Sequence, residues 1–242
     1  HKKFGVHDWV KKELENSAFE AEEAALDVVG VSNSEGAESS WGRSFVALAT
    51  SNNFVAGRRG TSHSLSVSVL AGEGTEMERD YDYSVSVFKE DLDNAKLLGR
   101  SAGKKAVARL KPQKVETAKV PVVFDPRASN SLLSHFANAI NGAAVARGTT
   151  FLKEKLGKPI FNEEIVICDD PMRPRGLRSK AFDAEGVLTE KRNLIENGVL
   201  TSWILDLRSA RQLRLETTGH AVRGTSSSPS PSTSNLYMEP GS

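Results

Sequence analysis

Strict alternation of polar and apolar residues in one segment is the feature that most constrains this fold. Residues 62–69 read Ser-His-Ser-Leu-Ser-Val-Ser-Val, which places Leu65, Val67 and Val69 on one face and the serines on the other. Successive strand side chains point to opposite faces, so this period of two predicts a strand. After a turn at Gly72-Glu73-Gly74 the pattern repeats, through Tyr81, Tyr83, Val85 and Val87. The two segments predict an antiparallel sheet with one wetted face.

Two amphipathic helices are expected beside this sheet. Residues 8–29 and 91–110 are rich in Ala and Lys, with apolar residues at helical spacing, and Lys111-Pro112 ends the second helix. Between them, residues 33–36 predict a turn, residues 45–49 a short strand, and Asn52-Asn53 a chain reversal. Residues 1–118 are therefore expected to form an N-terminal α+β domain of helix, β-meander and helix.

A polar connection over residues 111–119 places a domain boundary near Lys119. In the C-terminal domain, residues 119–242, we expect a strand over residues 120–124, and Asp125-Pro126 predicts the start of a helix that reaches about Ala146. The remaining expectations are a hairpin at Asn197-Gly198, a short helix from about Asp206, and a Ser/Pro-rich segment, residues 225–234, that is mobile unless another surface orders it. The expected fold class is α+β, with mainly antiparallel sheets and flanking amphipathic helices in two sub-domains.

Charge and cysteine content narrow the classes of partner. The 242 residues include 32 Lys and Arg against 31 Asp and Glu, and this balance gives no general field for nucleic acid or an anionic membrane. The single cysteine, Cys168, cannot form an internal disulfide and fits a reducing compartment. No apolar run approaches the roughly 18 residues that span a bilayer. We expect a cytoplasmic protein without direct contact to nucleic acid or membrane.

Few side chains are candidates for chemistry. Asp183 and Glu185 flank Ala184 beside Gly186, and this pair predicts either a solvated turn or an acid/base or metal site, with the turn favoured. His63 is interpreted as a surface histidine on the serine face of its strand. Cys168 has no accompanying motif, and the chain contains no Gly-x-Ser-x-Gly elbow and no Gly-rich phosphate loop.

Four segments carry a family resemblance. They read MERDYDYS at 77–84, LKEKLGKPI at 152–160, FDAEGVLTEKRNLIENGVL at 182–200 and TTGHA at 217–221. Together they resemble the TldD/PmbA family, known for proteins described as modulators of DNA gyrase and for TldD/TldE peptidases, and are most similar to its PmbA/TldE branch. The likeness runs from about residue 13 to Gly241. Family members are nearly twice this length, so the chain looks like the central half of such a protein, with an incomplete C-terminal domain.

The TldD branch of that family carries an HExxxH zinc motif on the first helix of its second domain, where two imidazoles face one cation and the glutamate acts as general base. The corresponding helix here has His135, but Phe136 and Ile140 occupy the glutamate and second histidine positions. The other histidines are dispersed, at positions 1, 7, 63 and 220. We therefore predict no catalytic, cofactor-binding or metal-ligating residue in this chain, and zinc only in a TldD-type partner.

Three functions follow from the resemblance and the residues. The first is a non-catalytic TldE/PmbA-type subunit that pairs with a TldD-type subunit to form a cytoplasmic peptidase for unfolded or extended peptides, with substrate or partner contacts expected between Phe182 and His220. The second is a homodimeric scaffold that binds peptides or proteins without hydrolysis. The third is an independent metallopeptidase whose ligands come from distant segments, for example His135, Asp183 and Glu185.

Overall fold

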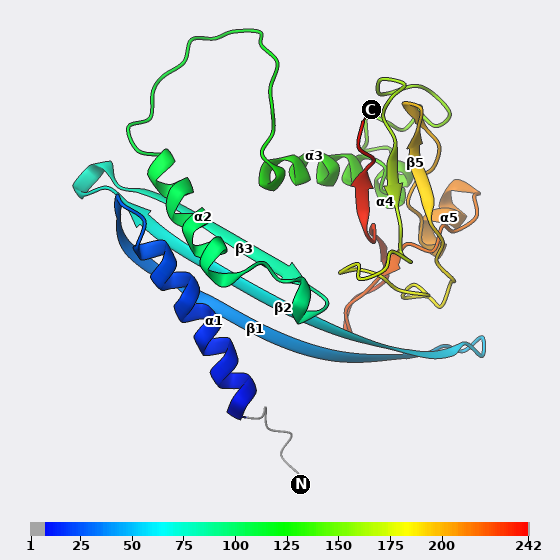
Figure 1. Cartoon of the computed structure of the whole chain (residues 1–242). Coiled ribbons are helices and arrows are strands. Elements are labelled where there is room, and N and C mark those ends of the chain that lie inside the picture. Colours follow the sequence, from blue (N-terminus) through cyan, green and yellow to red (C-terminus); the bar gives the residue numbers. More distant parts are fainter. Residues whose placement is uncertain (1–7, 242) are drawn as a thin grey trace. The chain divides into compact units, whose positions relative to one another are not determined.

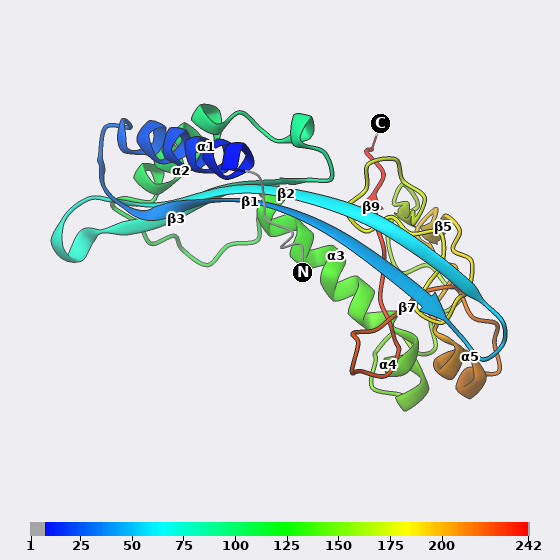
Figure 2. The ribbon, with the colours of Figure 1, turned by 90° about the horizontal axis from the view of Figure 1, so that it is seen from below.

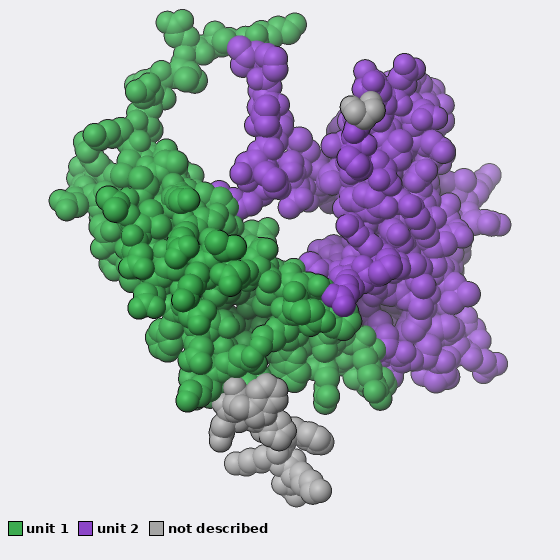
Figure 3. Space-filling model, in the orientation of Figure 1, with its two compact units in different colours: residues 1–45, 59–119 green, residues 46–58, 120–242 purple. Residues whose placement is uncertain are grey.

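The computed structural model describes residues 8–241 and divides the chain into two compact units. Unit 1 comprises the residues up to Phe45 together with Arg59–Lys119, and unit 2 comprises Val46–Arg58 and the residues from Val120 onward (Figure 3). Because unit 2 takes residues from two separate stretches, the proposed division into domains at residue 119 stays a prediction. The fold is mixed α and β with antiparallel sheets, as the sequence predicts.

Unit 1 is built on a three-stranded sheet of order β1-β2-β3, with two helices on one face (Figures 1 and 2). The strands are β1 (Val31–Ala49), β2 (Val55–Ala71) and β3 (Glu78–Ser86), and the helices are α1 (Asp8–Leu26) and α2 (Ala95–Ala108). Two 3-10 turns, η1 (Gly74–Glu76) and η2 (Lys89–Asp91), complete the unit. The predicted helices are confirmed, although both end earlier than expected.

Small residues bring the helices of unit 1 close together and onto the sheet. The core consists of Ala21 and Ala25 of α1, Leu98, Ala102 and Ala106 of α2, and Leu65, Val67, Val69 and Ala71 of β2. A Cβ atom on Gly99 would lie 2.0 Å from the carbonyl oxygen of Ala21, so only glycine permits this helix contact. The predicted apolar face of β2 is thus confirmed as the core face.

The prediction for β3 is wrong in its choice of face. Leu65 pairs with Ser84 and Val67 with Asp82, so the polar residues of β3 face the helices. Tyr81, Tyr83 and Val85 are exposed on the opposite face. The reason is electrostatic, because α2 presents Lys105 to Asp82 at 2.7 Å and Arg109 to Asp80 at 3.6 Å.

Two further predictions for unit 1 are wrong. No turn forms at residues 33–36; instead β1 runs through them, and Gly36 within it has a φ of 113°. His63 lies on the face of Leu65 rather than the serine face, because it pairs with Ser86, two residues from the Leu65 partner Ser84. The reversal at Asn52-Asn53 is confirmed by a turn in which Asn53 has a φ of 66°.

Unit 2 is built around a four-stranded sheet of order β6-β5-β4-β9 and three helices. Its elements are α3 (Pro126–Ala139), α4 (Gly142–Arg147), β4 (Ile167–Asp169), β5 (Arg192–Glu196), β6 (Val199–Leu200), α5 (Leu207–Leu213), β7 (Ala221–Val222), β8 (Ser230–Pro231) and β9 (Leu236–Met238). The largest fully buried side chains of its core include Ile140, Leu194, Ile195, Leu200 and Ile204. This core holds α3 and α5 against the sheet.

Several local predictions in unit 2 are confirmed. Asp125 caps α3 by accepting the N–H of Arg127, and Pro126 occupies its first turn. Asn197 and Gly198 have φ values of 48° and 76° in the turn between β5 and β6. Asp206 caps α5 by accepting the N–H of Ser209.

Two predictions in unit 2 are wrong. Residues 120–124 form no strand and are exposed, because Pro121 interrupts them and no strand of the described chain pairs with them. The helix after Asp125 breaks at Ile140, where Gly142 N–H donates to the Ile204 carbonyl oxygen and Asn141 caps α4.

The sequence predicts that the Ser/Pro-rich segment is mobile unless another surface orders it. Such a surface is present, since β8 pairs with β7 and Ser234 is buried.

Candidate functional site

The acidic pair that the sequence singles out forms a turn. Asp183 is 2% exposed, and its Oδ1 accepts the N–H groups of Glu185 and Val187 at 2.8 and 2.9 Å. Its Oδ2 accepts the N–H of Ala221 at 3.0 Å, so that both carboxylate oxygens are already bonded. The predicted turn organised by Asp183 is confirmed, but Asp183 is buried, so the expectation of a solvated turn is wrong for this side chain.

Glu185 supports a helix rather than a reaction. Its Oε2 accepts the N–H of Leu207 at 2.8 Å, in the first turn of α5. Burial raises the pKa of Glu185, while this hydrogen bond and the nearby Arg211 act in the opposite direction. A carboxylate at a helix N-terminus stabilises the free N–H groups there. Asp183 and Glu185 therefore connect the turn at 183–187 to β7 and α5.

The helix that carries the family's metal motif has a different set of side chains here. His135 of α3 is exposed, whereas Phe136 and Ile140 are 7% and 0% exposed and belong to the core of unit 2. Phe136 also contacts the ring of Phe161 edge-on, with centroids 5.8 Å apart. Across residues 8–241, no group of three or more His, Cys, Asp or Glu side chains is arranged to hold a metal ion. The third prediction, a zinc site of His135, Asp183 and Glu185, is thus wrong for the described chain.

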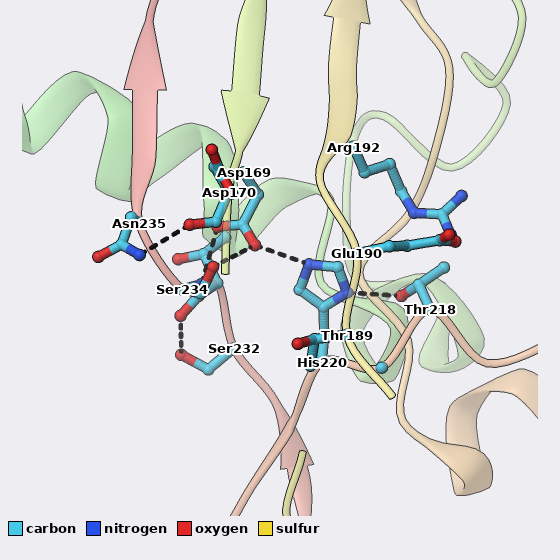
Figure 4. Close-up of polar contacts among 12 residues, drawn as sticks. Asp169, Asp170, Thr189, Glu190, Arg192, Thr218, His220, Ser232, Ser234 and Asn235 are labelled. Carbon is cyan, nitrogen blue, oxygen red and sulfur yellow. Dashed lines mark hydrogen bonds and ion pairs between the residues drawn. The ribbon is translucent and has the colours of Figure 1, made fainter. Parts of the chain in front are cut away.

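A buried polar network that the sequence did not indicate lies between β4 and the segments that precede β7 and β9 (Figure 4). Asp169 Oδ1 accepts the backbone N–H of Ser234 at 2.7 Å, and Asp169 Oδ2 accepts Ser234 Oγ at 2.7 Å. The same Oδ2 lies 3.1 Å from His220 Nε2, and His220 Nδ1 lies 2.8 Å from Thr218 Oγ1. Because a carboxylate only accepts, the proton of this contact sits on Nε2.

The network contains Ser, His and Asp but not in the order that activates a nucleophile. In a hydrolytic triad the imidazole stands between hydroxyl and carboxylate and takes the hydroxyl proton. Here the carboxylate of Asp169 stands between Ser234 and His220, so the Ser234 hydroxyl has an acceptor that cannot relay its proton to the ring. All three residues are at most 5% exposed. The arrangement fixes the loop around Ser234 to β4 and does not present a nucleophile.

An open pocket of about 670 Å³ in unit 2 adjoins this network. Its wall includes the end of β1 and the start of β2, the segment 177–184, and the residues that follow β7 and β8. Four basic side chains line it, namely Arg58, Arg178, Lys180 and Arg223, together with the carboxylate of Asp183 and the hydroxyl residues Thr225, Ser232, Thr233 and Ser234. Basic side chains therefore outnumber acidic ones on this concave surface of unit 2.

The segment Phe182–His220, which the sequence nominated for contacts, contributes only part of this pocket. Phe182 and Asp183 line it, whereas the Asn197-Gly198 hairpin and α5 do not. All four basic residues of the pocket, Arg58, Arg178, Lys180 and Arg223, lie outside the segment expected to make contacts and were not predicted. No local signal could have found them, because Arg58 lies more than a hundred residues from the other three and only the folded chain brings them together.

Cys168 belongs to the structure of the sheet. Its side chain is buried in β4, and burial raises the pKa of its thiol, partly opposed by a hydrogen bond with Tyr237 of β9. A thiol becomes a nucleophile when its pKa is lowered and it is exposed. Cys168 meets neither condition, in agreement with its lack of a motif.

Family models match both parts of the chain. Residues 8–110 match the PmbA/TldA metallopeptidase central domain and residues 117–242 match the PmbA/TldA metallopeptidase C-terminal domain. Metalloprotease PmbA of Escherichia coli O157:H7 is 38% identical over 205 residues, which are 84% of this chain and 46% of that protein. A Haemophilus influenzae homolog of PmbA is 35% identical over the same shares of both chains. The chain thus spans about half the length of these curated relatives.

Solved structures show the same fold over the whole chain. A Bacteroides thetaiotaomicron protein described as a putative modulator of DNA gyrase has a TM-score of 0.86 and 26% identity, covering 100% of this chain and 55% of that one. TldE from Thermococcus kodakarensis has a TM-score of 0.75 at 21% identity, covering 100% and 56%. Sequence and fold agree, and this chain belongs to the PmbA/TldA metallopeptidase family, also called TldD/PmbA.

Proposed function

We propose that this chain is the non-catalytic, PmbA/TldE-type subunit of a cytoplasmic peptidase, in which a TldD-type partner holds the zinc ion. Its substrates in this proposal are unfolded or extended peptides. The name metalloprotease belongs to its full-length relatives. The proposal concerns how this chain takes part in such an activity.

The observation that carries the proposal is the packing of α3. A zinc site of the HExxxH type needs a carboxylate next to the first histidine and a second imidazole in the following turn. Phe136 and Ile140 stand at those positions and fill the core of unit 2. An ionised group at either position would be buried among apolar side chains at a cost of several kcal/mol, on the order of the penalty for an unpaired buried charge. The donors of α3 therefore do not fit a zinc ion.

The sheet supports a role in holding extended peptides. β1 is the edge strand of the order β1-β2-β3, so one row of its backbone groups has no strand partner within the described chain. β1 is 19 residues long, and Phe45 and Val46 near its end are exposed. A long, exposed edge strand can pair with an added strand through main-chain hydrogen bonds. This feature suits a peptide with no fixed sequence.

The cytoplasmic location is part of the proposal. The single cysteine is free and buried, which suits a compartment that keeps thiols reduced. No helix within residues 8–241 has the length and apolar character needed to cross a bilayer.

Co-purification with zinc analysis tests the proposal. The full-length protein is expressed alone and together with an HExxxH-bearing family member from the same cell, and zinc content and cleavage of an unfolded peptide are measured. We expect zinc and cleavage in the complex, loss of both on chelation, and neither in the chain alone. His135→Ala changes an exposed residue and should leave zinc content and activity of the complex unaltered.

Two results would contradict this function. One is stoichiometric zinc in the isolated chain that the His135→Ala variant removes. The other is a chain that only self-associates and never recovers an HExxxH-bearing subunit, which would favour the alternative of a homodimeric binding scaffold without hydrolysis. The exposed tyrosines of β3 give that alternative a surface, since Tyr81 and Tyr83 stack with centroids 6.2 Å apart on the open face of the sheet.

A further inference from the structure

The pocket of unit 2 carries positive charge that the protein itself does not neutralise. Arg58, Arg178, Lys180 and Arg223 line it. None of these four side chains forms an ion pair within 4.0 Å with an acidic group of residues 8–241. Four basic side chains without an acidic partner therefore gather on the wall of one pocket.

The one carboxylate in the wall, Asp183, forms no ion pair with these basic side chains. Both oxygens of Asp183 accept backbone N–H groups, from Glu185, Val187 and Ala221. Lys180 Nζ reaches only the carbonyl oxygen of Ala221, at 3.4 Å. The ammonium group of Lys180 thus has a backbone acceptor but no carboxylate partner in the described chain.

The lowered pKa of Lys180 agrees with a site that would bind an anion. Burial lowers the pKa of Lys180, and the nearby Arg58 and Arg178 lower it further, against the opposite effect of Asp183 and Asp169. Like charges that are held near one another in a partly buried site raise the free energy of the charged state. A bound anion would remove that penalty.

The volume of the pocket and its apolar lining residues indicate which kind of anion it would bind. The volume of about 670 Å³ lies within the range of small-molecule sites, and apolar residues such as Leu48, Leu177 and Val222 stand beside the basic groups. A short piece of peptide matches this mixture, because it brings apolar atoms along with its charge. Arginine binds a carboxylate through two parallel hydrogen bonds.

A nucleic acid matches the pocket less well. Binding to single strands uses a continuous basic groove with exposed aromatic rings for the bases. The only aromatic side chain in this wall is Phe182, which is buried and packs against the ring of Phe54. The chain as a whole is nearly neutral, with 32 basic and 31 acidic residues.

We propose that this pocket binds a carboxylate group of an extended peptide, either the C-terminal carboxylate or an acidic side chain. Val46, Ala47 and Leu48 at the end of β1 form part of its wall, so a peptide added to that strand end would bring its charged group to the arginines. The inference shares with the proposed function only the premise that the chain handles peptides. It requires no catalytic partner.

Fluorescence polarisation with the purified full-length protein, without any partner, tests this proposal. Four labelled peptides of one sequence carry either Glu or Gln at one internal position and either a free or an amidated C-terminus. We expect at least one acid-bearing peptide to bind about tenfold more tightly than the Gln amide, the size of one charge-assisted hydrogen bond. The peptide that shows the gain identifies the terminal or the side-chain carboxylate as the ligand.

Single-arginine variants distinguish binding in the pocket from a general attraction between the acidic peptide and basic surface groups. Arg178→Gln and Arg223→Gln should each remove most of that preference, by about tenfold, and leave the amide peptide unaffected. Arg208→Gln is the matched control, since Arg208 is exposed on α5 and does not line the pocket. Higher salt should reduce the preference of the unaltered protein, since the pocket is open to solvent.

Three outcomes would overturn the inference. They are equal binding of all four peptides, an equal loss on Arg208→Gln and on the pocket variants, and displacement of the acidic peptide by a short oligothymidylate that binds more tightly. Each can be told apart from failure of the proposed function, because the binding is measured on the isolated chain while pairing and cleavage are measured on the complex.

Discussion

Buried carboxylates in this protein accept hydrogen bonds from backbone N–H groups, some of them near in sequence and others distant. Asp169 accepts the N–H of Ser234, Asp183 accepts three backbone N–H groups, and Asp206 accepts the N–H of Ser209. A carboxyl group bonded in this way fixes the chain segments around it. At the residue scale, Asp183 thus supports the wall of the pocket, and the basic side chains supply its charge.

Asp82 allows a test through pH. Burial alone would raise its pKa, but hydrogen bonds from Lys105, Ser101 and the Tyr83 N–H together lower it below the ordinary 3.8. A carboxyl whose pKa is lowered by folding stabilises the protein above its unfolded-state value, and this stability is lost as pH falls through the folded-state value.

We therefore expect Lys105→Met to lower the free energy of unfolding by about 1 kcal/mol at neutral pH. The deficit should shrink as pH falls from 3.8 through the lower folded-state pKa of Asp82, because Asp82 then becomes protonated in the unaltered protein too. Urea unfolding at neutral pH and at an acidic pH below that folded-state pKa measures the deficit. Lys104→Met, at an exposed neighbouring position, should have little effect. A deficit that is the same at both pH values would show that the Lys105 stem, not its charge, stabilises unit 1.

At the scale of elements, the β5–β6 hairpin combines a backbone requirement with a steric one. Gly198 has a φ of 76°, and a Cβ atom there would lie 2.5 Å from the Phe161 carbonyl oxygen. Its own carbonyl oxygen accepts the N–H groups of Ile160 and Phe161, so the turn also fixes the segment before β4.

Gly198→Ala should destabilise the protein by about 3 kcal/mol, the sum of a left-handed alanine and a backbone clash. Gly157→Ala is the control, because Gly157 has a φ of 73° but open space around its Cβ position, so that only about 1 kcal/mol is expected. Thermal unfolding compares the two. Equal losses would mean that the close approach to residues 161 and 162 contributes nothing.

The same scale shows which elements a sequence can predict. The Asn197-Gly198 turn and the caps at Asp125 and Asp206 depend on neighbouring residues, and they form as predicted. The break of the helix at Ile140 depends on a hydrogen bond to Ile204, 64 residues away, so the periodicity of residues 126–146 could not reveal it. The contact of Asp169 with His220 spans 51 residues, and no spacing rule covers it.

At the scale of the whole molecule, an exposed connection joins the two parts of the chain. Residues 112–125 have no helix or strand, and Val115, Val120 and Val123 within it are more than 60% exposed. Such segments lack the buried contacts that resist local opening, and proteases cut there first.

Limited digestion with trypsin should therefore cut at Lys114 and Lys119 before it cuts within either unit, as mass spectrometry of the early fragments will reveal. The two fragments should remain together on size exclusion and separate only in denaturant, because unit 2 includes residues 46–58 of the N-terminal fragment. A variant with both lysines changed to glutamine should survive longer. Fragments that separate under native conditions would contradict this assignment of residues 46–58.

The discontinuity of unit 2 also bears on the order in which the chain folds. The tip of the β1–β2 hairpin is synthesised more than sixty residues before Val120, yet it completes a unit made mostly of later residues. Contacts over such separations carry a loop-closure cost and slow folding. During synthesis on the ribosome, the hairpin tip therefore cannot pack into unit 2 until the C-terminal half of the chain has emerged. A fragment of the protein that begins at residue 120 lacks residues 46–58 and therefore cannot form the whole of unit 2.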